Sequence, residues 1–230
     1  MELAIFSYPG LHLVLKWLHI FFGIMWIGHL YYFNFTQGSF MTQTDGPTKS
    51  QVQQRLLPIA LYWFRWGAMW TFVSGLLMLH TASKIGFSLG GDWGVKILTG
   101  GLFGILMWAN VWFIIWPKQK VVIQNATDVA GGKPANPAVP GIAAAAGLAS
   151  RTNTLLSIPM LFFMVAAPHL AIEMNMDNVG AYWAFLAVLL IALEFNAIKG
   201  KQGPMTTVKG VITSGFVLTA IVYLAMELIL

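Results

Sequence analysis

Five histidines carry most of the metal-binding and proton-transfer chemistry that this sequence offers, because the chain contains no cysteine. Without cysteine it cannot form disulfides, thiolate metal sites, covalently attached c-type haem or cysteine-bound iron–sulfur clusters. Any redox group must therefore be held by other side chains. The sequence also lacks the motifs GxGxxG, HExxH, GxSxG and the P-loop, which excludes the common nucleotide-binding and hydrolase signatures.

His19 differs from the other histidines because it lies well inside a long apolar run, where an ionisable side chain is a functional candidate by default. His12 and Trp26 recur on its helix face at spacings of seven residues. A neutral imidazole that donates its Nδ1–H presents Nε2 as an axial ligand. We therefore predict that His19 binds a haem iron. His12, His80 and His169 fall near helix ends, where a histidine at the lipid headgroups is the simpler interpretation.

Two basic residues also lie in positions that call for a partner. Arg65 is roughly 13 Å into the second apolar run, where an unpaired guanidinium costs at least about 2.5 kcal/mol. A haem propionate, an anionic substrate or Glu194 would pair with it, and snorkelling to the headgroups is the alternative. Lys96 follows Asp92 and Trp93 at the start of the third run. It could receive a carboxylate or be an ordinary interfacial lysine.

Six apolar runs must position these side chains. The chain has 230 residues, of which 57% are hydrophobic and 9% charged, whereas soluble domains carry about 25% charged residues. We predict an all-α, single membrane domain whose transmembrane helices span residues 11–33, 56–79, 95–116, 154–170, 179–198 and 208–230. Residues 121–147 are rich in Gly, Pro and Asn and read as an irregular loop, in which 142–149 could begin a short helix.

The positions of Lys and Arg predict the orientation of this bundle. The first, third and fifth connections hold nine basic residues, the second holds two and the fourth none. Because basic loops stay in the cytoplasm, both termini are expected on the periplasmic side of a bacterial inner membrane. The net charge of +5 is scattered over these loops, so nucleic acid is not an expected partner.

Four stretches carry a family resemblance: KWLHIFFGIMWIGHLYYFNF (16–35), RLLPIALYWFRWGAMWTFVSGLLML (55–79), NVWFIIWPKQK (110–120) and SRTNTLLSIPMLFFM (150–164). They resemble the N-terminal membrane domain of the bacterial membrane-bound urate oxidases, closely in the first four runs and loosely in the last two. The resemblance implies oxidation of urate to 5-hydroxyisourate, with electrons passed to cytochrome c. No CxxCH motif occurs, so the family's cytochrome c domain is expected to be missing and a c-type partner to be a separate protein.

A weaker likeness reaches the haem-binding membrane protoporphyrinogen oxidases. The shared positions are His19, Trp26, Lys96, Asn153 and Pro159. This likeness implies that His19, as the first-helix histidine, ligates haem b. The family's third-helix histidine is replaced here by Trp108 and Asn110, so a second axial ligand is not transferred. His80 or His169 would have to take its place.

The sequence therefore favours a haem-b-containing membrane oxidoreductase. It would take electrons from a small anionic substrate such as urate and pass them to a separate cytochrome c or a respiratory complex. The candidate cofactor-binding residues are His19, His80, His169, Arg65 and Lys96. One alternative is a non-catalytic haem-binding or structural subunit of a larger respiratory complex. A transporter or channel is a weaker alternative, because no inverted repeat is visible.

Overall fold

The computed structural model describes residues 3–230 and folds nearly all of them into helices, with no strand among these residues. Helices satisfy every backbone N–H and C=O within the segment, as an apolar environment requires. The nine α-helices are α1 (Tyr8–Tyr31), α2 (Gly38–Gln43), α3 (Gly46–Gln51), α4 (Leu57–Lys84), α5 (Asp92–Ala109), α6 (Trp116–Ala130), α7 (Val139–His169), α8 (Val179–Lys199) and α9 (Val208–Ile229).

Shorter segments of wider or tighter helix join these elements. Three π-helical segments continue neighbouring α-helices without a break: η2 (Tyr32–Gln37), η3 (Val52–Leu56) and η4 (Asn110–Ile115). Three 3₁₀ turns, η1 (Ala4–Phe6), η5 (Met176–Asn178) and η6 (Gly203–Thr206), precede α1, α8 and α9. The helix that begins at α5 therefore runs through η4 to the end of α6.

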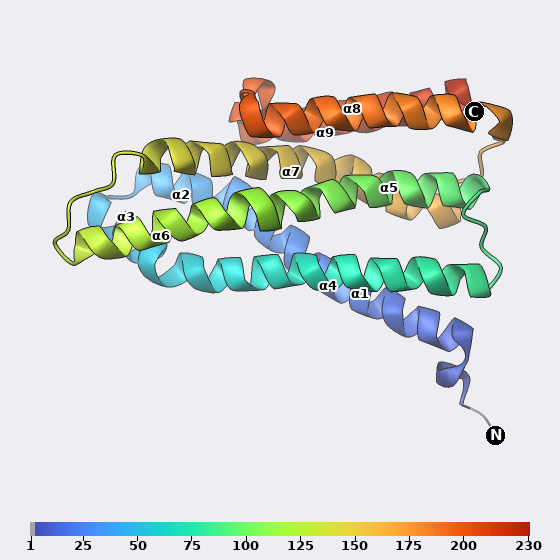
Figure 1. The fold of residues 1–230 in the computed structure, drawn as a ribbon, viewed down its shortest axis with the longest axis horizontal. Helices are drawn as coiled ribbons and strands as arrows, with labels where there is room; N and C mark the ends of the chain where they lie inside the picture. Colours follow the sequence, from blue (N-terminus) through green and yellow to red (C-terminus); the bar gives the residue numbers. More distant parts are fainter. Residues whose placement is uncertain (1–2) are drawn as a thin grey trace.

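The long helices lie side by side in a bundle (Figure 1). The pair α8 and α9 lies along one side, the pair α1 and α4 along the other, and α7 with the α5–α6 helix lies between them. Helix α1 packs mainly on α4, while α5 and α9 pack mainly on α7. The start of α1 and the end of α9 lie at the same end of the bundle.

Five helical stretches are long and apolar enough to cross a membrane: Tyr8–Gln43, Asp92–Ala130, Val139–His169, Met176–Lys199 and Val208–Ile229. This confirms the all-helical class and supports a multi-pass membrane protein. Helix α4 is 28 residues long but is absent from this set, since Arg65, His80 and several tryptophans make it less apolar. The sixth crossing and the periplasmic termini therefore stay predictions.

The irregular loop predicted over 121–147 is wrong. Helix α6 continues to Ala130 and α7 already begins at Val139, which leaves a connection of only 131–138. The apolar runs were shorter than the helices that contain them, because α6 and α7 extend beyond the apolar sequence. Gly132 has a φ of 85°, a left-handed conformation that ends α6. Pro140 stands in the first turn of α7, where it costs no helical hydrogen bond.

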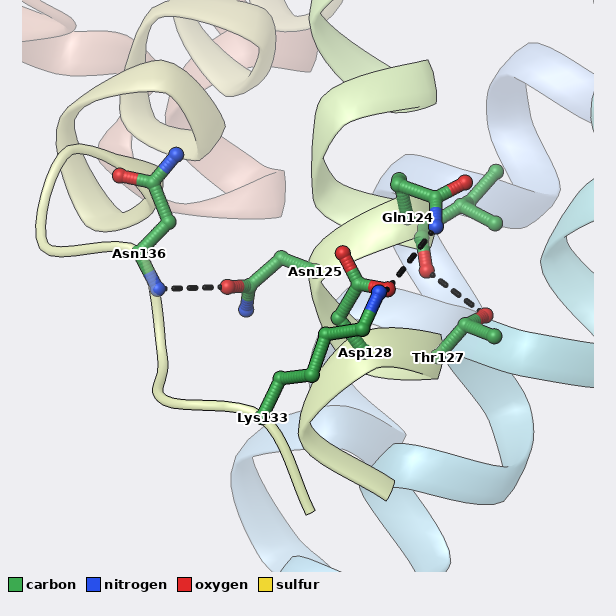
Figure 2. A network of polar contacts seen from close by, with 7 residues as sticks. Gln124, Asn125, Thr127, Asp128, Lys133 and Asn136 are labelled. Carbon is green, nitrogen blue, oxygen red and sulfur yellow. Dashed lines mark hydrogen bonds and ion pairs between the residues drawn. The ribbon is translucent and has the colours of Figure 1, made fainter. Parts of the chain in front are cut away.

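Polar contacts hold this short connection in place (Figure 2). Lys133 Nζ lies 2.8 Å from Asp128 Oδ1 near the end of α6. The backbone N–H of Asn136 donates to Asn125 Oδ1 over 2.8 Å. Both contacts tie the connection back to α6, so the Gly- and Pro-rich composition encodes a defined turn.

Helix α5 approaches α7 closely at Gly100. A Cβ atom placed there would lie 3.2 Å from both the Met160 carbonyl oxygen and Phe163 Cβ. Small residues allow helix backbones to come together in this way inside a membrane. The close approach fixes the rotation of α5 and thus the directions in which the η4 side chains point.

Candidate functional site

Helices α1 and α4 meet along a seam in which contacts repeat every seven residues on both helices. The pairs are His12 with Thr81, His19 with Ser74, and Trp26 with Gly67. The first two are hydrogen bonds of 2.8 and 3.2 Å between an imidazole Nδ1 and a hydroxyl oxygen. At the third pair, a Cβ on Gly67 would lie 3.0 Å from the backbone nitrogen of Trp26. Only glycine therefore lets the two backbones approach there.

The hydrogen bonds around His19 define which of its nitrogens is free. The Ser74 hydroxyl has one hydrogen, and it donates to the backbone oxygen of Trp70 (2.6 Å) or Thr71 (3.1 Å). With that hydrogen on the backbone, Ser74 Oγ accepts the hydrogen of His19 Nδ1, and we assign this tautomer to His19. In this tautomer, Nε2 of His19 is unprotonated. This is the tautomer that a metal-ligating histidine requires.

The other two predicted histidine ligands do not join His19. His80 is exposed near the end of α4, six residues or about 9 Å along the axis from Ser74. His169 is the last residue of α7 and is also exposed. No described contact links either histidine to His19. Neither is positioned as a second ligand opposite His19.

Lys96 is completely buried, unlike the interfacial lysine considered from the sequence. Its ammonium forms an ion pair of 2.7 Å with Asp92 one turn earlier and donates to the backbone oxygen of Leu170 at the end of α7. The carboxylate that the sequence led us to expect therefore comes from its own helix. Two of the three N–H groups of the ammonium make these contacts, so Lys96 couples α5 to α7.

Arg65 projects from α4 and lies against one aromatic ring of α6 and one of α4 itself. Its guanidinium carbon lies 3.9 Å from the ring centre of Trp116 and 5.8 Å from that of Tyr62. Arg65 Nε is buried without a hydrogen-bond partner. The ion pair with Glu194 considered from the sequence is absent, because the two ion pairs among residues 3–230 involve Lys96 and Lys133.

Three tryptophans at spacings of four line the face of the α5–η4–α6 helix that meets α4. Trp108 stacks on Phe72 at 4.3 Å, Trp112 contacts Trp66 edge-on at 5.6 Å, and Trp116 lies under Arg65. In an α-helix, residues four apart advance by about 40° beyond a full turn. The wider turn of η4 offsets this drift and keeps all three rings on one face. Such π-helical segments often occur at functional sites.

This aromatic seam contains donors that have no acceptor. Trp108 Nε1, Trp112 Nε1 and Arg65 Nε are all buried and lack hydrogen-bond partners. Buried polar groups are normally paired, so three unpaired donors along one seam indicate that an acceptor from outside the chain belongs there. Arg65, Trp112 and Trp116 are each half-buried, which leaves the seam reachable from the molecular surface.

The opposite face of η4 carries a polar network that joins three helices. Asn110 is fully buried, and its Nδ2 donates to Asn153 Oδ1 on α7 (3.0 Å) and to Glu194 Oε2 on α8 (3.1 Å). Asn153 Nδ2 in turn donates to the backbone oxygen of Met107 (2.9 Å). The sequence offered Glu194 as a partner for Arg65, and its contact with Asn110 was not predicted. The presence of Asn110 and Asn153 within apolar runs could have indicated this polar network.

Comparison with known proteins places the chain in a family. Residues 87–226, more than half of the chain, match the family described as Urate oxidase N-terminal. The chain belongs to that family. The match runs from just before α5 to the last turn of α9, so it contains η4, Asn153 and Glu194. The resemblance to urate oxidases predicted from the sequence is thereby confirmed.

The family match differs from the predicted resemblance in its extent. The sequence likeness was closest in the first four apolar runs, whereas the urate oxidase match includes the last two and leaves out α1 and all of α4. No curated protein and no solved structure matches the chain.

Proposed function

We propose that this chain is a membrane oxidoreductase of the urate oxidase type, which oxidises urate to 5-hydroxyisourate. Membership of the Urate oxidase N-terminal family carries this proposal. The reaction adds water to urate and removes two electrons and two protons. The protein must therefore bind a planar, electron-rich substrate and provide an exit for electrons.

The aromatic seam of α4 and η4 suits such a substrate. Urate is flat and anionic and presents several carbonyl oxygens as acceptors. Arg65 supplies a cation, and the unpaired Nε1 groups of Trp108 and Trp112 supply donors. Stacked rings favour a planar ligand, and a guanidinium without a carboxylate partner favours an anion. We assign Arg65, Trp108 and Trp112 as the urate-binding residues.

His19 would hold a haem b, through which electrons would pass to a separate cytochrome c or a respiratory complex in the bacterial inner membrane. A haem supplies one-electron redox chemistry. We assign His19 as one axial ligand, because its Nδ1 bonds Ser74 and it lies seven residues deeper in α1 than His12, which bonds Thr81 in the same way. His80, His169 and Lys96 do not lie where they would complete the site. Both termini lie on the periplasmic side in this proposal, which brings His19 nearer to a periplasmic acceptor.

The decisive experiment is urate oxidation by the purified full chain in detergent with an artificial electron acceptor. We expect urate to disappear and 5-hydroxyisourate to form in a 1:1 ratio, with one two-electron acceptor reduced for each urate. Boiled protein is the control. If folded protein leaves urate unchanged with the artificial acceptor and with cytochrome c, yet co-purifies with a respiratory oxidase, the chain is a non-catalytic subunit.

Substitution of His19 by alanine tests the haem ligand separately. We expect the b-type absorption band of the purified protein to vanish, because the Nε2 that ligates iron is lost. His12→Ala is the matched control: His12 lies on the same seam, its Nδ1 pairs with Thr81 as His19 pairs with Ser74, and we expect the band to persist. A band that survives in the His19 variant would show that the iron is ligated elsewhere.

A further inference from the structure

A shallow groove of about 350 Å³ lies between α5 and α8, on the side of η4 away from the aromatic seam. It is lined by Leu106, Leu190, Ile191, Glu194 and Phe195. Ile191 and Phe195 are 69% and 67% exposed, so the groove opens outward. Both helices belong to the apolar stretches that are able to cross a membrane. In a bilayer, this opening faces lipid.

One end of this apolar groove is polar. Glu194 Oε2 accepts a hydrogen bond from Asn110 Nδ2, and Asn153 also binds that amide. Glu194 Oε1 has no partner among the described residues, and Asn110 Oδ1 is buried without one. A carboxyl group that faces lipid is costly and usually functional. The fully buried Asn110 holds it in a fixed position at the groove wall.

We propose that the Glu194 groove binds the ring of a lipid-soluble quinone. A ligand that arrives through lipid must itself be lipid-soluble, and the walls suit a flat apolar ring. The carboxyl group requires a polar counterpart on that ring. Protonated Glu194 donates to a quinone carbonyl, and ionised Glu194 accepts from a hydroquinone hydroxyl. An acyl chain would fill the groove but leave Glu194 Oε1 unpaired, which favours the quinone over a structural lipid.

A quinone in this groove would serve as a second electron acceptor, beside the proposed cytochrome c or respiratory complex. Urate, water and quinone would give 5-hydroxyisourate and hydroquinone, so that two electrons and two protons pass from urate and water to the quinone. Glu194 is the protein group beside the ring that can release and regain a proton. This acceptor role rests on the proposed urate oxidation, whereas the binding of quinone does not.

The binding of decylubiquinone to the purified full chain tests the proposal, with decanol as a tail without a ring. We expect Glu194→Leu to weaken quinone binding about tenfold, through the lost hydrogen bond. Glu194→Gln keeps a donor and should bind within about threefold of the parent. Ile191→Trp fills the groove without removing a polar contact and should block binding. Glu227→Leu, an exposed carboxyl on α9, is the matched control.

Each outcome either supports or contradicts the quinone site. If decanol competes as well as the quinone, or if Glu194→Leu binds as tightly as the parent, the groove holds a lipid tail only and the proposal fails. The same holds if Ile191→Trp has no effect. Loss of urate oxidation with intact quinone binding would contradict the proposed function and leave the quinone site standing.

Discussion

Substitution of Asp92 by alanine is expected to lower the free energy of unfolding by about 3 kcal/mol. The Lys96 side chain is 1% exposed, and its ion pair with Asp92 is 2.7 Å long. Without the carboxylate, a buried ammonium keeps only the backbone oxygen of Leu170. Removal of one partner from a buried pair is strongly destabilising because the remaining charge is uncompensated. The measurement is unfolding of purified protein in mixed micelles with increasing denaturing detergent.

A comparison of how strongly two variants lower the free energy of unfolding distinguishes this explanation from simple loss of packing. Lys96→Met removes the more buried residue but should cost less than half as much, because Met fills the same space and Asp92, 39% exposed, can turn to water. The double variant should resemble Lys96→Met alone. If Asp92→Ala is no more destabilising than Lys96→Met, the ion pair does not carry the stability of this contact.

Arg65→Ala is expected to reduce kcat/KM for urate about 100-fold, which corresponds to about 2.7 kcal/mol and to the loss of one or two charge-assisted hydrogen bonds. Arg65→Lys should recover little of this loss, since an ammonium neither stacks flat on Trp116 nor presents a planar pair of donors. The measurement is the initial rate of urate oxidation across a range of urate concentrations, with thermal unfolding as the check on folding.

Arg55 provides the matched control for this experiment. It is an exposed arginine in η3, near the start of α4, and its removal lowers the net charge by the same amount. We expect Arg55→Ala to keep the parent kinetics. Equal kinetics for the parent and both alanine variants would remove Arg65 from the urate site.

Much of the fold could be predicted from the length of the apolar runs. The second run, expected over 56–79, lies within α4, although the helix itself continues through η3 back to Gly46. The ends were less predictable, because helices continue into polar sequence wherever another helix supports them. In α6, Val122 and Ala126 are buried one turn apart, and this apolar stripe stabilises a helix that hydropathy alone does not reveal.

The candidate site was predictable as single residues but not as contacts. Depth and residue type pointed to His19, Arg65 and Lys96, because ionisable groups are rare in apolar helices. Their partners depend on helix rotation, which one sequence does not define. The sequence offered Glu194 as a partner for Arg65, yet the group beneath it is the ring of Trp116 on another helix. The π-helical turn that brings Trp116 there left no signal in the sequence.

One helix carries both ends of the proposed electron path. Ser74, which bonds the proposed haem ligand His19, and Arg65, the proposed substrate-binding residue, lie nine residues apart on α4, a rise of about 14 Å. No loop or hinge separates them. The separation between electron donor and electron acceptor is therefore a property of a continuous hydrogen-bonded rod, and thermal motion elsewhere in the protein should leave the electron-transfer rate nearly constant.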